Sequence, residues 1–175
     1  YLAYGWEDVA ERGQSGSDDT GLRRLYQMKP ASTSNATKWF DYTNDHSEMS
    51  YEEELRIQLD AFPGITFTYN PYHISDDDRI LISGMPIWNA YFSDLTGDGL
   101  PEICAQVSHG SGIIDSRVII FDYTNGASYT LEDRGYHDYY LYMEEGYLHV
   151  GKWDSTKISV SSGKLIFKDG CIQVE

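Results

Sequence analysis

The sequence predicts a mainly β fold: an antiparallel meander, arranged as a sandwich or an open barrel-like sheet, with one or two short helices near the N-terminus. Apolar and polar residues alternate with a period of two through most of the chain after residue 50, which is typical of strands with one buried face. Turn signals separate these runs at hairpin spacing, and the C-terminal half has no room for the helical crossovers that parallel strands need. The length of 175 residues suits one domain.

The first part of the chain differs from the rest. Residues 1–45 are expected to be a peripheral segment, and residues 46–175 to be a β-domain. Residues 13–20 and 31–37 are mostly small and polar, as loops are, and a short helix that ends before Pro30 is expected between them. Its apolar positions are Leu22, Leu25, Tyr26 and Met28.

The strands are read from the alternating runs. Ser50 to Glu53 fits a helix capping box, but Leu55, Ile57 and Leu59 alternate as in a strand, and the strand is favoured. The later runs are 65–69, 80–82, 103–107, 118–120, 139–143, 148–150, 158–160, 165–167 and 172–174. Turn signals lie at Pro63-Gly64, Gly97-Asp98-Gly99, Asn125-Gly126, Glu145-Gly146, Ser162-Gly163 and Asp169-Gly170.

Composition limits the partners and the location. A net charge of −15 and a pI near 4.5 argue against nucleic acid and anionic membrane surfaces, and they favour divalent cations as counter-ions, although an acidic surface also simply aids solubility. No window approaches the roughly 20 apolar residues of a membrane span, so this segment is not expected to insert. The chain begins at Tyr1 without a leader, so any export signal or membrane anchor is expected upstream.

The two cysteines, Cys104 and Cys171, lie far apart, each in an apolar stretch. Their spacing matches neither a redox pair nor a zinc knuckle. Both are expected in the core, and a disulfide between them is the open alternative.

Residues 94–102 predict a calcium-binding loop between two strands. They read Asp-Leu-Thr-Gly-Asp-Gly-Leu-Pro-Glu, with oxygen-bearing side chains at loop positions one, three, five and nine around a glycine at position six. Calcium takes six to eight oxygen ligands, and the glycine lets the backbone reverse tightly around the ion. The expected ligands are Asp94, Thr96, Asp98, the carbonyl of Leu100, and Glu102.

This loop is not an EF-hand, because position twelve is Ala105 and strands flank it. It resembles the loops of integrin-type FG-GAP repeats, in which calcium holds a hairpin together. Magnesium is disfavoured because it prefers a stricter octahedron and retained waters. An ion-free turn rich in Asp and Gly is the alternative.

A wider resemblance covers about the last two-thirds of the chain. It is carried by four segments: Met85-Pro86-Ile87-Trp88, the loop at 94–102, residues 110–115, and residues 129–134. The chain resembles the extracytoplasmic C-terminal region of membrane metallopeptidases of the β-lactam sensor-transducer type in gut Firmicutes. The resemblance implies an exported location, as a secreted, surface-held or membrane-anchored lipoprotein-like domain, and a sensory or accessory role. His109 departs from it, since an aromatic residue is expected there.

No catalytic motif is recognised in the sequence. The metallopeptidase signature H-E-x-x-H is missing, and Ser111 lacks the glycines at positions 109 and 113 that the G-x-S-x-G motif of a nucleophile elbow requires. The five histidines show no pairing at zinc-ligand spacing, so the chain is not predicted to be an enzyme.

Two functions follow. The first is an exported, non-catalytic, calcium-binding domain that contacts a protein, peptide or cell-wall component. The alternative is a carbohydrate-binding module, suggested by fifteen tyrosines, because sugar rings stack on exposed aromatic rings; packing of half-buried tyrosines on strands explains them equally well. Its candidate residues are Tyr136, Tyr139, Tyr140 and Trp153.

Overall fold

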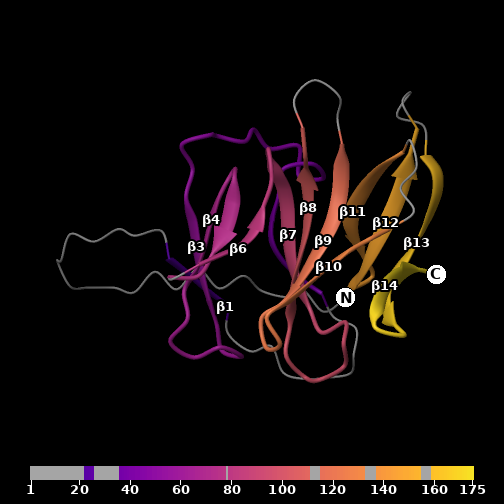
Figure 1. Ribbon diagram of the computed structural model, residues 1–175. Coiled ribbons are helices and arrows are strands. Elements are labelled where there is room, and N and C mark those ends of the chain that lie inside the picture. The colour runs from indigo at the N-terminus through magenta and orange to yellow at the C-terminus, as the bar shows by residue number, and fades with distance from the viewer. Residues whose placement is uncertain (1–21, 26–35, 78, 111–114, 133–136, 155–158) are drawn as a thin grey trace.

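The structure is a computed structural model that describes residues 22–25, 36–77, 79–110, 115–132, 137–154 and 159–175 (Figure 1). All regular elements in these ranges are β-strands. They are β1 Leu22–Leu25, β2 Thr37–Asp41, β3 Leu55–Leu59, β4 Phe67–Asn70, β5 His73–Ser75, β6 Ile80–Ser83, β7 Ile87–Ser93, β8 Glu102–Ser108, β9 Ser116–Asp122, β10 Ala127–Thr130, β11 Asp138–Glu144, β12 Tyr147–Trp153, β13 Ser159–Lys168 and β14 Cys171–Val174. The mainly β prediction is therefore confirmed.

The strands form three sheets rather than one (Figure 1). The first has the order β1-β3-β4-β5-β6, the second β10-β9-β8-β7-β2, and the third β11-β12-β13-β14. Most neighbours are consecutive and antiparallel, as in a meander; β1 pairs with β3 in parallel, and β2 joins β7 across the chain. The second sheet lies in the middle, so the molecule has three layers where the sequence predicted a sandwich or a barrel-like sheet.

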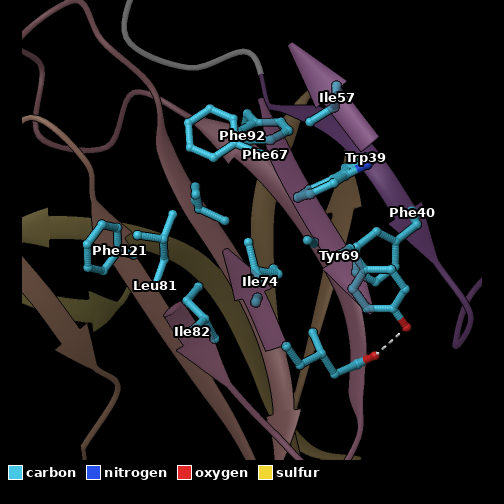
Figure 2. Close-up of a cluster of buried hydrophobic side chains, with 14 of the residues drawn as sticks. Trp39, Phe40, Ile57, Phe67, Tyr69, Ile74, Leu81, Ile82, Phe92 and Phe121 are labelled. Atoms are coloured by element: carbon cyan, nitrogen blue, oxygen red, sulfur yellow. Dashed lines mark hydrogen bonds between the residues drawn. The ribbon is translucent and has the colours of Figure 1, made fainter. Parts of the chain in front are cut away.

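The middle sheet is packed on both faces, and every residue of β8 is buried. Toward the first sheet, Phe92 stacks on Trp39 with ring centroids 5.6 Å apart and lies 6.1 Å from Phe67 (Figure 2). The opposite face packs on the third sheet through a separate cluster. That cluster includes Tyr91, Cys104, Val118, Ile120, Leu141, Leu148, Val150, Leu165 and Ile172.

Part of the expected peripheral segment belongs to the core. β2 is an edge strand of the middle sheet, and its Trp39 and Phe40 are only 2% and 7% exposed. Leu22–Leu25, expected in a helix, instead pair with β3 as strand β1, because the open edge of that sheet offers backbone partners that outweigh a weak local helix preference. Tyr26 and Met28 of the expected helix lie outside the described residues.

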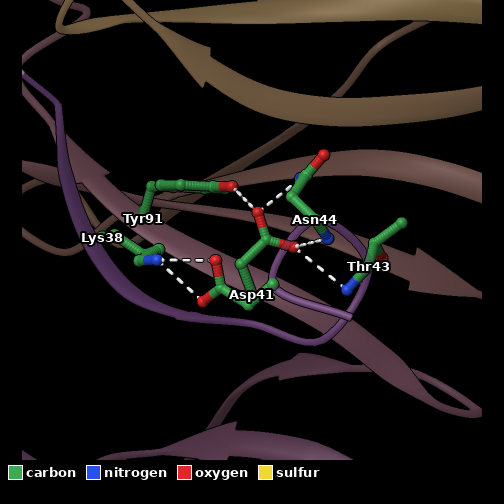
Figure 3. A network of polar contacts seen from close by, with 6 residues as sticks. Lys38, Asp41, Thr43, Asn44 and Tyr91 are labelled. Carbon is green, nitrogen blue, oxygen red and sulfur yellow. Dashed lines mark hydrogen bonds and ion pairs between the residues drawn. The ribbon is translucent and has the colours of Figure 1, made fainter. Parts of the chain in front are cut away.

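A buried carboxylate holds β2 to the middle sheet (Figure 3). Asp41 accepts hydrogen bonds from the backbone nitrogens of Thr43 and Asn44 at 3.1 and 2.8 Å, and from the Tyr91 hydroxyl and the Asn44 amide. These donors satisfy a carboxylate that is 4% exposed, so the end of β2 and the turn after it are fixed on β7.

Most turn predictions agree with the structure, and one is wrong. Turns lie at Pro63-Gly64, Asn125-Gly126, Glu145-Gly146 and Asp169-Gly170, and β3 forms where the strand was favoured. Ser162-Gly163 is no turn, because β13 runs through it. A Cβ on Gly163 would lie 2.4 Å from the Glu175 carbonyl oxygen, so this glycine marks a close backbone approach inside a strand.

The cysteines are both free. Cys104 is buried in the core as expected, whereas Cys171 is exposed on the edge strand β14, which corrects its expected burial.

Candidate functional site

The loop between β7 and β8, here called the ion loop (residues 94–102), closes a hairpin. Ser93 on β7 lies opposite Glu102 on β8, which brings the two ends of the loop together. Gly97 and Gly99 have φ angles of 79° and 88°, a left-handed conformation that side chains disfavour and that lets the loop reverse twice. The two glycines therefore explain how so short a loop can fold back on itself.

The first carboxylate of the ion loop organises its turn. Asp94 Oδ1 accepts the Gly97 amide at 2.7 Å, and Oδ2 accepts the Gly99 amide at 3.0 Å. Asp98 Oδ1 accepts the Leu100 amide at 2.8 Å. The loop backbone thus donates inward to carboxylates, and their remaining lone pairs stay free to bind a cation.

Glu102 is the buried member of the site. It is 2% exposed, and it accepts hydrogen bonds from the Leu95 amide at 2.6 Å and the Thr96 hydroxyl at 2.7 Å. Burial raises the pKa of Glu102 above its ordinary value, the charge of Asp94 raises it further, and the hydrogen bonds from Thr96 and Leu95 lower it. A buried carboxylate beside a second one favours a nearby cation.

The three carboxylates converge. One oxygen from each of Asp94, Asp98 and Glu102 lies within 4.8 Å of the other two, and this is the one cluster of its kind that the described residues contain. Oxygens that bind one cation at about 2.3 to 2.6 Å can be at most roughly 5 Å apart, so this spacing allows a single cation to contact all three carboxylates. None of the four ion pairs in the described part of the chain involves these acids.

Two further predicted ligands lie in the same loop, with other contacts. The Thr96 hydroxyl donates to Glu102. The Leu100 amide donates a hydrogen bond to Asp98, and the Leu100 side chain packs against the core. The structure thus brings together the three acidic members of the predicted ligand set, and it places Thr96 and Leu100 as their hydrogen-bond partners.

The residues predicted for sugar binding do not form one surface. Tyr139 is 5% exposed and packs in the core beneath the third sheet, where its hydroxyl donates to the Glu132 carbonyl at 2.6 Å. This corrects its expected exposure: neighbours on a strand point to opposite faces, so Tyr139 and Tyr140 cannot share a platform. Tyr136 lies outside the described residues.

Tyr140 and Trp153 belong to an aromatic row on the outer face of β11 and β12, together with Tyr142 and His149. Tyr140 stacks on Trp153 with centroids 4.8 Å apart and planes at 24°, and on Tyr142 at 5.5 Å and 29°. The Tyr142 ring lies 5.6 Å from His149. The sequence analysis missed Tyr142 and His149, although the spacing of Tyr140 and Tyr142 by two residues places them on one face.

The aromatic row packs mainly against itself. Trp153 lies opposite Asp138, which precedes Tyr140 by two residues, and Tyr142 follows Tyr140 by two residues on the same face of the strand. The Tyr140 ring therefore stacks between two neighbours, which cover both of its faces. Tyr140 and Trp153 also cover Gly151, whose added Cβ would lie 3.6 and 3.5 Å from them. Ring faces that are stacked in this way are not available to a sugar.

Comparison of the chain with protein-family models, curated proteins and solved structures gave no match. The family resemblance of the sequence therefore stays a prediction. In the ranges that the structure describes, no helix has the length and hydrophobicity needed to cross a membrane.

Proposed function

We propose that the chain is a non-catalytic, calcium-binding sensory or accessory domain that acts outside the cytoplasm and contacts a protein, peptide or cell-wall component. The observation that carries this proposal is the convergence of the Asp94, Asp98 and Glu102 carboxylates within 4.8 Å. The extracytoplasmic location rests on the sequence resemblance alone.

The three acids of the ion loop would have different roles in binding a cation. Glu102 begins β8 and is fixed by Leu95 and Thr96, so its carboxylate is held in place by the sheet. Asp94 is fixed by the loop amides, and Asp98 lies exposed at the tip. Calcium bound there would neutralise the repulsion among the three acids and tie the loop to the hairpin.

The carbohydrate alternative receives less support from the geometry. The rings of the aromatic row cover one another, and Tyr139 is buried. The acids of the ion loop, by contrast, already lie at ligand spacing.

The proposal is tested by melting the protein with excess calcium and with EDTA. A ligand that binds only the folded state at 100 times its Kd stabilises it by about 2.7 kcal/mol. For a chain of this size we expect the Tm to be higher in calcium by roughly 5 to 11 °C. Magnesium at the same concentration is expected to shift the Tm less, because its shorter bonds suit these oxygens less well.

Asp98→Asn is the matching variant, because it removes one charge from an exposed side chain whose Oδ1 accepts a hydrogen bond from the Leu100 amide. We expect this variant to fold in EDTA and to lose most of the calcium-induced rise in Tm. Asp77→Asn removes the same charge from an exposed site between β5 and β6 and should keep that rise. Equal calcium responses in the two variants, or none in the wild type, would contradict the proposal.

A further inference from the structure

The end of the molecule opposite the ion loop exposes a tyrosine patch, formed by Tyr51, Tyr72 and Met85. These side chains are 61%, 48% and 60% exposed, and the Tyr51 and Tyr72 rings lie 6.0 Å apart. The backbone at Met85 is close to that of Tyr72, because the amide of its neighbour Gly84 donates to the Tyr72 carbonyl at 2.9 Å. Large apolar side chains exposed together are typical of a contact surface.

The segment that carries Tyr51 is strongly acidic. Residues 42–54 contain Asp45, Glu48, Glu52, Glu53 and Glu54, and they contain no lysine or arginine. Asp45 pairs with Lys38 and Glu54 with Arg56, whereas Glu48, Glu52 and Glu53 take part in none of the ion pairs that the described residues form. The patch therefore lies beside uncompensated negative charge.

A hollow adjoins this segment. Its lining includes four carboxylates, from Asp41, Asp45, Glu48 and Glu53, against the single cation of Lys38. The Tyr42 ring also lines it, and its hydroxyl donates to Glu53 Oε2. Glu53 of the hollow follows Tyr51 by two residues, so an acid-lined hollow and an exposed tyrosine ring belong to one segment, a combination that is complementary to a cation carried on an apolar stem.

We propose that this end of the molecule binds a basic peptide segment of a partner protein. A lysine or arginine of the peptide lies in the hollow near Glu48 and Glu53, and neighbouring basic or apolar side chains pack on the rings of Tyr51 and Tyr72. Tyrosine faces attract ammonium and guanidinium groups, and the acidic rim steers such a segment toward them. This deepens the accessory role proposed above by naming the partner, and it rests on that role without using the ion loop.

The two surfaces are separated along one strand. β7 starts at Ile87, next to the patch, and ends at Ser93, where the ion loop begins. Seven extended residues span roughly 23 Å. Peptide binding and calcium binding can therefore be measured independently on the same protein.

The test uses the whole chain and a fluorescein-labelled hexapeptide of the sequence Lys-Leu-Arg-Lys-Leu-Arg, followed by fluorescence anisotropy at about 50 mM salt. We expect saturable binding by the wild type. The double variant Tyr51→Ser, Tyr72→Ser should bind roughly 5- to 30-fold more weakly, as expected for two exposed cation–π contacts. The double variant Glu48→Gln, Glu52→Gln should also bind more weakly and depend less on salt.

Matched controls separate this site from general attraction to an acidic protein. Ile80→Ser with Met143→Ser removes two exposed apolar side chains elsewhere, and Asp77→Asn with Glu144→Gln removes two charges elsewhere; both should bind like wild type. Circular dichroism verifies that every variant is folded.

Equal peptide affinity in the tyrosine variant and the wild type would overturn the proposal. So would binding of uncharged cellohexaose to the wild type, lost in the tyrosine variant, without any binding of the peptide. Melting curves in calcium and in EDTA on the same samples test the ion loop, so the two proposals can fail separately.

Discussion

At the scale of single residues, Glu102 links the fold to the candidate ion. It is 2% exposed, it starts β8, and its oxygens are held by Leu95 and Thr96. A charge in that position is costly unless it is neutralised by a proton or by a cation. The same carboxylate thus weakens the ion-free fold and favours the ion-bound one.

This gives a pH prediction. Because the pKa of Glu102 is raised in the folded chain, the folded state binds more protons than the unfolded state between the ordinary value of 4.5 and the raised one. Stability is therefore lost as the pH rises through that interval. In EDTA, the free energy of unfolding of the wild type should fall relative to that of Glu102→Gln from pH 4.5 upward, in urea titrations of both proteins.

A constant difference between the two proteins at every pH would show that Glu102 does not titrate in this way. Glu102→Gln should also abolish the calcium-induced rise in Tm, and Asp77→Asn again serves as the control for charge.

Among single residues, sequence spacing agrees with the structure on the convergence of three acids, while the binding of calcium by them stays a prediction. The spacing of Asp94, Asp98 and Glu102 predicted a cluster, because a nine-residue loop with two glycines has few ways to close. Sequence did not distinguish the half-buried Tyr140 from the fully buried Tyr139, since tyrosine suits either face of a strand. The exposure of Cys171 was missed because the sequence pattern of an edge strand does not differ from that of an inner strand.

At the scale of elements, β13 shows how a glycine can mislead. Ser162-Gly163 has the composition of a turn, but the chain continues straight through it. The reason lies across the sheet: Lys164 and Glu175 exchange backbone hydrogen bonds of 2.8 and 2.9 Å, which brings the end of the chain against Gly163. Such a partner is invisible in a local sequence pattern.

Gly163→Ala is expected to be destabilising for this reason. The added Cβ would lie 2.4 Å from the Glu175 carbonyl oxygen and 2.8 Å from Val174 Cγ1, closer than real contacts. Overpacking of this kind costs typically 1 to 3 kcal/mol, which urea denaturation measures. Ser162→Ala, at the exposed neighbouring position, should change stability little. An unchanged unfolding midpoint for Gly163→Ala would mean that β14 and the residue after it do not pack on β13 as described.

The strand β2 was missed for a different reason. Its apolar part is short, Trp39 and Phe40, and follows a polar run that reads as a loop. Pairing with β7 and the hydrogen bonds to Asp41 fix it, and these contacts are made with residues some 50 positions later in the chain. Local patterns therefore predicted the hairpins well and this long-range pair not at all.

At the scale of the whole molecule, polar residues connect the layers. Alternation along β8 predicted one apolar face, formed by Ile103, Ala105 and Val107, and on the other face Cys104 alone was expected in the core. That other face, which also carries Gln106, is fully buried under the third sheet. Polar residues that bind a neighbouring layer look in sequence like polar residues that face water, so the third layer could not be predicted.

The connection is made at Leu141 on β11. Gln106 Oε1 accepts the Leu141 amide at 3.0 Å, and the Asn89 side-chain amide donates to the Leu141 carbonyl at 2.8 Å. Gln106 Nε2 in turn donates to Ser116 Oγ at 2.9 Å. Two side chains of the middle sheet thus pair both backbone groups at one position of an edge strand, where backbone groups otherwise lack partners.

Gln106→Leu keeps the approximate size of this side chain and removes its hydrogen bonds. The Leu141 amide is then buried without a partner, which costs about 1 to 3 kcal/mol. We expect a drop in Tm of roughly 2 to 12 °C and faster hydrogen exchange at Leu141 than at the neighbouring strand β12. Gln58→Leu, where the side-chain amide donates to the Thr66 hydroxyl in the first sheet, should leave exchange at Leu141 unchanged. Wild-type exchange at Leu141 in Gln106→Leu would show that the third sheet is held by its apolar contacts alone.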